Sequence, residues 1–183
     1  GKLVINLTVN FKLTGDASLL IGNEWSSGTV HLANTANDFA GDILIQGTGN
    51  KLTYANGALG NARVALSYGN ALGLYEPDFL GVIKAGSDGV LATATSADLD
   101  LRGTVLSLGA DGAYTYTGKL AVDDTYRFGG SGQLTLDTAL DGADSMRIDG
   151  QGTTGSSVTF TREKAFTGSI VAGGGLELAE PNS

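Results

Sequence analysis

Apolar and polar residues alternate along much of this chain with the two-residue period of β-strands. In the longest run, from Leu3 to Leu13, every second residue is apolar. Side chains at i and i+2 share one face of a strand, so this run predicts a long half-buried strand at 3–13. Shorter apolar pairs at i and i+2 recur beyond it, at Val30/Leu32, Ile43/Ile45, Leu52/Tyr54, Val64/Leu66, Leu72/Leu74, Leu99/Leu101, Leu134/Leu136, Met146/Ile148, Val158/Phe160 and Leu176/Leu178.

Turn-forming residues separate these short apolar pairs. Gly, Asn, Asp and Ser gather between them, for example at Asn56-Gly57, Asp88-Gly89 and Asp111-Gly112. Many pairs follow one another at about 8 to 12 residues, and no stretch carries an apolar stripe of helical period between capping residues. The pattern therefore predicts an all-β protein.

One five-residue pattern occurs three times. An aromatic residue is followed by a small residue, Gly, a polar residue and an aliphatic residue, so the first, third and fifth side chains share one face of a strand. We expect these three to point inward, with Gly leaving room beneath an aromatic ring of a neighbouring rung. The residues are Phe39, Gly41 and Ile43; Tyr116, Gly118 and Leu120; and Phe166, Gly168 and Ile170.

Very short strands with internal similarity favour a stack of repeated turns. A solenoid of this length would have about eight rungs of ~20 to 25 residues. We expect one β-helical segment over 1–183, with 1–36 as N-terminal rungs or a cap, 37–178 as repeat-bearing rungs and 179–183 as a tail. A closed barrel or a sandwich remains open at this point.

Composition narrows the function classes. Hydrophobic residues make up 42% of the chain and charged residues 16%, which is enough apolar surface for a core and too little charge for intrinsic disorder. The formal net charge is −8, and Lys and Arg form no cluster, so nucleic acid and anionic membranes are poor partners. Because the chain starts at Gly1 without an initiator Met, we expect it to be a segment of a longer protein.

The repeated pattern carries a family resemblance. Asn37-Asp38-Phe39-Ala40-Gly41-Asp42-Ile43 is followed by Gly49-Asn50-Lys51-Leu52-Thr53-Tyr54, then Gly57-Ala58-Leu59-Gly60 and Val64-Ala65-Leu66. A shortened version returns between Phe166 and Leu178. These residues resemble the passenger-associated repeat of bacterial autotransporters, the self-secreting proteins of the type V pathway, most closely over 37–74 and 165–178.

The resemblance implies a right-handed parallel β-helix displayed on the outer surface of a Gram-negative cell. Many passengers of this kind act as adhesins in host attachment, aggregation or biofilm formation. Their rungs nearest the membrane often form an autochaperone segment that templates folding, for which Phe166, Gly168 and Ile170 are the candidate residues here. The family's C-terminal outer-membrane β-barrel and its serine protease module are absent from this sequence. The implied partners are a host surface protein or glycan, or a second copy, and the parent chain would carry the barrel.

The residues offer little enzyme chemistry. His31 is the single histidine, and between Val30 and Leu32 it is expected to face solvent, away from any base or nucleophile of a catalytic triad. With one His and no Cys, a zinc or other soft-metal site lacks ligands. We therefore expect neither a cofactor nor an enzyme.

The most enzyme-like feature is a short alternating charged stretch. Asp98, Asp100 and Arg102 alternate with Leu99 and Leu101, which places two carboxylates and a guanidinium on one outer face. In β-helical polysaccharide lyases such carboxylates bind calcium beside a basic residue that abstracts a proton. A solvated face with weak charge pairs explains the pattern equally simply and is preferred, because no second carboxylate strand lies one rung away.

Several weaker signals remain. Asp141, Asp144 and Asp149 match no calcium-loop spacing and are interpreted as turn residues.

Exposed aromatic residues could stack on sugars or contact proteins, although about half of them are expected in the core. The candidates are Tyr54, Tyr68, Tyr75, Tyr114 and Trp25. The sequence thus predicts an adhesive passenger segment, with a carbohydrate-active β-helix and a purely structural stalk as alternatives.

Overall fold

The computed structural model describes residues 3–75, 81–141, 145–149, 156–162, 168–173 and 176–178, and these contain strands and turns but no α-helix. None of the described segments forms a helix of the length and apolarity that crossing a membrane requires. The strands are β1 (Leu3–Val4), β2 (Leu7–Val9), β3 (Leu19–Ile21), β4 (Ser26–Leu32), β5 (Asp42–Ile45), β6 (Asn50–Tyr54), β7 (Arg63–Leu66), β8 (Ala71–Leu74), β9 (Val90–Thr93), β10 (Leu99–Asp100), β11 (Ser107–Ala110), β12 (Ala113–Tyr116), β13 (Leu120–Ala121), β14 (Thr125–Phe128), β15 (Gln133–Leu136), β16 (Ser145–Ile148), β17 (Ser157–Phe160), β18 (Ser169–Ala172) and β19 (Leu176–Leu178).

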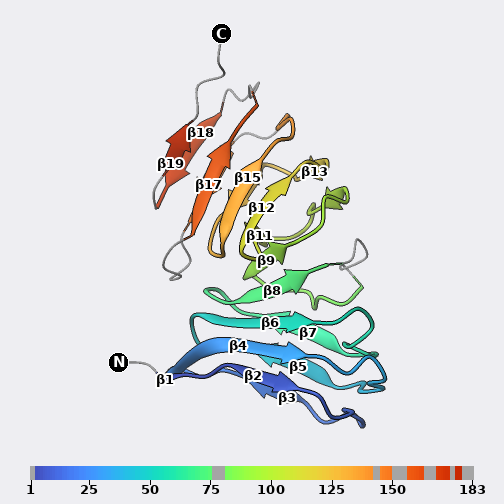
Figure 1. The fold of residues 1–183 in the computed structure, drawn as a ribbon. Coiled ribbons are helices and arrows are strands. Elements are labelled where there is room, and N and C mark those ends of the chain that lie inside the picture. Colours follow the sequence, from blue (N-terminus) through green and yellow to red (C-terminus); the bar gives the residue numbers. More distant parts are fainter. Residues whose placement is uncertain are drawn as a thin grey trace.

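Every pair of named strands is parallel, as a stack of coils requires. The long sheet has the order β1-β4-β6-β8-β9-β11-β14-β16-β18, with β2 also paired to β4. Three smaller sheets complete the turns, with the orders β3-β5-β7, β10-β13 and β12-β15-β17-β19. The chain climbs turn by turn from its blue N-terminal end to its red C-terminal end (Figure 1). The expected β-solenoid is confirmed, with about seven turns, because a sandwich or an up-and-down barrel would pair its strands antiparallel.

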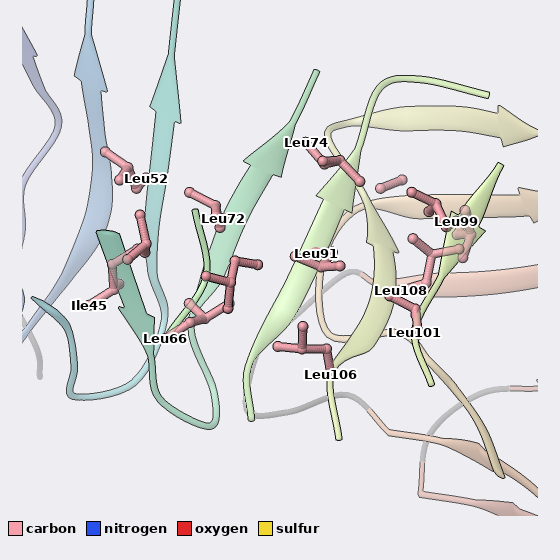
Figure 2. Close-up of a cluster of buried hydrophobic side chains, with 14 of the residues drawn as sticks. Ile45, Leu52, Leu66, Leu72, Leu74, Leu91, Leu99, Leu101, Leu106 and Leu108 are labelled. Atoms are coloured by element: carbon pink, nitrogen blue, oxygen red, sulfur yellow. The ribbon is translucent and has the colours of Figure 1, made fainter. Parts of the chain in front are cut away.

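The core consists of lines of apolar side chains that run from turn to turn. One line follows the register of the long sheet through Leu7, Val30, Leu52, Leu72, Leu91, Leu108, Phe128, Ile148 and Ala172. Successive members lie about 17 to 24 residues apart, so the turns are less regular than the expected repeat. Figure 2 shows Leu52 and Leu72 of this line beside Ile45 and Leu66. Farther along the stack, Leu91 lies near Leu106, and Leu108 lies near Leu101.

Burial along this line is greatest in the middle of the stack, and Val30, which pairs with Leu7, is only partly buried. Leu52, Leu72, Leu91 and Leu108 are buried, whereas Leu7 in the first turn is 51% exposed. Burying one such side chain contributes about 1.5–3 kcal/mol. Each turn is therefore stabilised by the turns above and below it, as in other solenoids.

Asparagine residues fill the corner that precedes the long sheet. Asn70 is 1% exposed, and its Oδ1 accepts hydrogen bonds from the Asn50 backbone N–H (3.0 Å) and the Asn50 Nδ2 (3.3 Å). Its own Nδ2 donates to the carbonyl oxygens of Gly47 (3.0 Å), Ser67 (3.1 Å) and Tyr68 (3.3 Å). This short asparagine ladder satisfies carbonyl groups that the turns would otherwise leave buried without a partner.

The prediction of one long strand at 3–13 is wrong. The structure has two short strands, β1 and β2, and between them Asn6 Oδ1 accepts the Thr29 backbone N–H at 3.0 Å, so a side chain takes the place of a backbone ladder bond. Of the alternating apolar residues only Val9 is buried, and Leu3, Ile5, Leu7 and Phe11 are exposed. The physical reason is position, because within the described residues the first turn has a neighbouring turn on one side only.

Candidate functional site

The first two copies of the repeated pattern lie in the core, and they explain why glycine is needed. Phe39 and Ile43 are buried, and a Cβ built on Gly41 would lie 2.2 Å from the Ala17 carbonyl oxygen and 2.7 Å from Phe39 Cζ. A Cβ on Gly118 would lie 2.5 Å from the Ser96 carbonyl oxygen and 2.8 Å from the Tyr116 hydroxyl. The glycine thus lies against the ring of its own pattern and a backbone carbonyl of the preceding turn. The ring of a neighbouring rung, which we expected above it, is not the contact.

The aromatic residue of the second copy is also a polar anchor. Tyr116 is fully buried, and its hydroxyl donates toward the carbonyl oxygens of Ala97 (2.9 Å) and Lys119 (2.8 Å). Burial raises the pKa of the Tyr116 hydroxyl above its ordinary value, and nearby Asp98 adds to that shift. The neutral phenol therefore ties two turns together. Leu120, the last residue of the pattern, is buried as expected.

Asn37, two residues before Phe39, connects three successive turns. Its Oδ1 accepts the Leu13 backbone N–H at 2.8 Å, and its Nδ2 donates to the Ala58 carbonyl oxygen at 2.7 Å. The side chain is almost completely buried. The Asn-x-aromatic-x-Gly sequence is thus a stacking unit, in which the amide spaces the turns and the ring fills the core.

The third copy of the pattern departs from the expectation. Phe166 lies outside the described residues. Gly168 is exposed, and Ile170 is 46% exposed, although its register with buried Met146 keeps it on the inward line. The prediction that Gly168 and Ile170 are buried is therefore wrong. β18 is the last strand of the long sheet, and no described strand of that sheet lies beyond it.

Asp98, Asp100 and Arg102 do share an outer face, but they are engaged with each other and with the backbone. The Arg102 Nε and Nη2 donate to the two oxygens of Asp100 at 2.8 and 2.5 Å, and Asp98 Oδ1 accepts the Lys119 backbone N–H at 2.8 Å. Hydrogen bonds from Arg102 lower the pKa of Asp100 to about 2. Asp100 in turn raises the pKa of Arg102, which makes this guanidinium a still poorer proton acceptor.

Within the residues that the structure describes, no set of side chains is arranged to bind a metal ion. No three His, Cys, Asp or Glu side chains within those residues are placed to hold an ion. His31 is half-buried rather than fully solvated, and its Nδ1 lies 2.9 Å from Thr53 Oγ1 on the strand above. Asp144 lies outside the described residues, and Asp141 contributes its backbone carbonyl to the Tyr126 hydroxyl at 2.7 Å.

A polar cluster that the sequence did not predict lies on the outer face of the long sheet. We call Lys51, Tyr75 and Asp111 the outer-face cluster. Lys51 Nζ forms an ion pair with Asp111 Oδ1, and the Tyr75 hydroxyl donates to Asp111 Oδ2 at 2.5 Å. All three side chains are partly buried. Burial works to raise the pKa of Asp111, but the hydrogen bonds from Lys51 and Tyr75 outweigh it and lower that pKa.

A second contact across several turns shows that this face is curved. The Tyr68 hydroxyl donates to Asp149 Oδ2 at 2.9 Å, and Arg147 Nη2 donates to the same oxygen at 2.9 Å. Tyr68 precedes β8 and Asp149 follows β16, four steps away along the long sheet. In a flat sheet that separation is about 19 Å, farther than the two side chains reach together. The outer face of the long sheet is therefore concave, and the stack bends between the lower and upper turns of Figure 1.

The floor of this concave face is apolar. Ala71, Val90 and Ala92 form a small buried cluster separate from the main core, since their neighbours Leu72 and Leu91 face the interior. The Tyr75 ring lies over Gly73 in the same layer, because a Cβ there would meet the Tyr75 ring at 2.8 Å. Curvature thus gives the solenoid a second, minor core on its outside.

The remaining aromatic candidates divide between core and surface. Tyr54 is buried with its ring edge-to-face on Tyr75, and the Tyr114 hydroxyl lies 3.1 Å from Ser96 Oγ. Trp25 and Tyr68 are exposed. Trp25 is available for contacts with a partner, whereas the Tyr68 hydroxyl is bonded to Asp149 and the other two residues hold the turns together.

No protein-family model, curated protein or solved structure shows significant similarity to this chain.

Proposed function

We propose that this chain is a surface-displayed autotransporter passenger segment that acts in adhesion, through contacts with a host surface protein, a host glycan or another copy of itself. The observation that carries this proposal is the in-register parallel stack, which is the architecture that the family resemblance implies. On this proposal the chain lies on the outside of a Gram-negative cell. Its parent then carries a C-terminal outer-membrane β-barrel.

Adhesion by such a segment would depend on outward side chains that repeat from turn to turn. Parallel strands in register place outward side chains one above another, for example Thr115, Thr135 and Thr159. Weak contacts that repeat along a rigid stack add up to avidity without any single strong site. The exposed Trp25 side chain and the exposed part of the Tyr68 ring supply contact surface for a partner.

A carbohydrate-active solenoid is the less favoured alternative. A lyase needs a basic group that is free to take a proton from the sugar. Arg102 instead donates two hydrogen bonds to Asp100, and Asp98 accepts a backbone N–H. We therefore propose a non-enzymatic role, and assays with acidic polysaccharides and calcium would reveal unsaturated products if this is wrong.

We also include an autochaperone role of the last turns in the proposal. β18 pairs with β16 on one side and leaves its other edge without a described neighbour, so a strand could be templated there. Refolding from denaturant with and without 165–183 tests this role. A truncated chain that refolds as fast as the full chain would contradict it.

Display on cells separates an adhesin from a plain stalk. The 183-residue chain would be fused to an autotransporter β-barrel in a non-adherent Gram-negative host, with the barrel alone as control. Adhesion predicts faster cell settling or greater attachment to host cells at equal surface amounts, measured by flow cytometry. Equal display without a gain in either assay would leave only a structural stalk and overturn the adhesive function.

A further inference from the structure

A sheet of the solenoid is interrupted in the middle of the stack. β3, β5 and β7 pair in order, and Ile83 of the next turn adds a single parallel bridge to Val64. The turn after that begins a different sheet, β10-β13. The sheet that starts with β3 thus ends at Ile83, with described turns on both sides of the interruption.

The backbone of Ile83 faces this interruption without a strand partner. Val64 donates its N–H to the Val82 carbonyl oxygen at 2.7 Å, and its own carbonyl oxygen accepts the Lys84 N–H at 2.8 Å. In a parallel bridge of this kind the N–H and carbonyl group of the middle residue, Ile83, point to the opposite side. Neither group forms a backbone hydrogen bond among the described residues, although Ile83 is only 8% exposed. Buried backbone groups are nearly always paired, so this is a free edge at which another strand can add.

A groove of about 440 Å³ lies beside this edge. One wall comes from residues 83–87 and the other from residues 103–106 of the next turn. Ile83, Val105 and Leu106 supply its apolar part, and Val105 is 50% exposed. The volume lies within the range of ordinary ligand sites, and the elongated gap between two turns suits an extended chain.

The charge at the groove favours an acidic partner. Arg63 and Lys84 line it, and none of the described residues that line it is Asp or Glu, although the whole chain carries −8. Lys84 Nζ is paired with Asp42 Oδ2 at 2.5 Å. Arg63 is exposed and forms no ion pair among the described residues. A guanidinium in this state can bind a carboxylate through two parallel hydrogen bonds.

We propose that this groove binds an extended segment of a partner protein. The segment pairs its backbone with Ile83, places an acidic side chain against Arg63 and packs an aliphatic side chain on Val105. In such strand addition the backbone supplies affinity and alternate side chains supply specificity. The inference rests on the proposed adhesive function and deepens it, because it names an extended acidic peptide as the part of a host surface protein that is recognised.

Fluorescence polarisation with the purified chain and a short labelled peptide of alternating valine and glutamate tests the groove. We expect saturable binding, and Arg63→Glu should weaken it at least about tenfold, because a carboxylate then faces a carboxylate. Lys119→Glu is the matched control, since Lys119 is exposed, lies outside the groove and undergoes the same change of charge. It should leave the dissociation constant unchanged.

Two further peptides separate strand pairing from charge. The same peptide methylated at every backbone nitrogen keeps its carboxylates but cannot donate to Ile83, and it should bind at least about tenfold more weakly. The peptide with lysine in place of glutamate keeps its backbone donors and should not bind, because it brings ammonium groups to Arg63.

Circular dichroism melting checks that each variant folds, and Arg63→Gln decides if Arg63→Glu does not fold. Absence of binding to the acidic peptide overturns the proposal. So does binding that the Arg63 substitution leaves intact, or that Lys119→Glu weakens equally, since the latter result indicates general electrostatic attraction. Equal binding of the methylated peptide overturns the strand pairing. Because purified protein is used here and displayed cells test adhesion, either claim can fail while the other holds.

Discussion

At the scale of single residues, the close approach of a neighbouring backbone explains why some positions must be glycine. The carbonyl oxygen of Ala17 lies where a Cβ of residue 41 would be, and the Phe39 ring fills the other side. No rotamer change can relieve a clash with backbone. The Gly of the repeated pattern is therefore required by packing, whereas many other glycines of the chain serve the turns.

Gly41→Ala should destabilise the protein by about 1–3 kcal/mol, because the added methyl overpacks a site bounded by backbone. Urea denaturation monitored by circular dichroism measures the change. Gly81→Ala is the matched control, since a Cβ at Gly81 meets nothing within 4 Å and its φ is not positive. The control should be neutral or stabilising by up to about 1 kcal/mol. Equal effects of the two substitutions would refute the assigned packing.

Asn70→Ala should also cost stability, for a different reason. The substitution removes the side-chain hydrogen bonds of Asn70 to the Asn50 backbone N–H and to the Gly47 carbonyl group, whereas the Ser67 carbonyl group keeps the backbone N–H of residue 70. Each buried polar group that loses its partner costs about 1–3 kcal/mol. Asn61→Ala, at an exposed position, should change the free energy of unfolding by less than about 0.5 kcal/mol. Thermal melts of the two variants side by side would show whether the ladder matters.

At the scale of elements, contacts between distant strands hold the bend of the long sheet. Lys51 follows the start of β6 and Asp111 follows β11, so their ion pair links turns that are not adjacent. Both side chains are less than a quarter exposed, whereas the Asp100–Arg102 pair is about half exposed. Because solvent weakens exposed pairs, the first should contribute to stability and the second hardly at all.

Asp111→Asn should lower the free energy of unfolding by about 1.5–3 kcal/mol at pH 7, the range for hydrogen bonds to a charged group. The pKa of Asp111 is lowered in the folded protein, so its contribution is complete above the ordinary Asp pKa of about 3.9. The contribution is lost as the pH falls through the lowered value. The difference between wild type and variant should therefore be constant from pH 7 to about pH 5 and shrink below about pH 4.

Denaturation curves at a series of pH values measure this difference. Asp100→Asn serves as the control at the exposed pair and should have little effect at any pH. A difference between wild type and Asp111→Asn that persists undiminished at the acid end would mean that the charge of Asp111 is not what stabilises the bend.

The sequence predicts the strands well and their distant contacts poorly. Apolar pairs such as Ile43/Ile45 and Val64/Leu66 mark β5 and β7, because a half-buried strand must alternate. Tyr126 and Phe128 in β14 carry the same signal. The Lys51–Asp111 pair has no local signal at all, since it depends on how several turns bend together. The first strand was predicted too long because alternation cannot reveal that a turn lacks a neighbour.

At the scale of the whole molecule, stability is shared between neighbouring turns. The middle of the main apolar line is fully buried, whereas Leu7 at one end and Ala172 at the other are exposed. The first and last described turns are thus less buried than the middle of the stack. The templating proposed at the last turn follows from this gradient.

Disulfide trapping tests the parallel, in-register stack most directly, because the chain has no cysteine of its own. Thr115 pairs with Thr135, and Thr135 pairs with Thr159, on the outer face of β12, β15 and β17. Adjacent strands lie about 4.8 Å apart, within the Cα separation that a disulfide accepts.

Under mild oxidation, the double variants Thr115→Cys/Thr135→Cys and Thr135→Cys/Thr159→Cys should each form an intramolecular disulfide. The variant Thr115→Cys/Thr159→Cys should stay reduced, because its two positions are separated by a whole strand, about 9.6 Å. Mass spectrometry of alkylated protein counts the free thiols. Two bridged neighbouring pairs and one unbridged pair are the result that the solenoid predicts, and free thiols in both neighbouring pairs would contradict it.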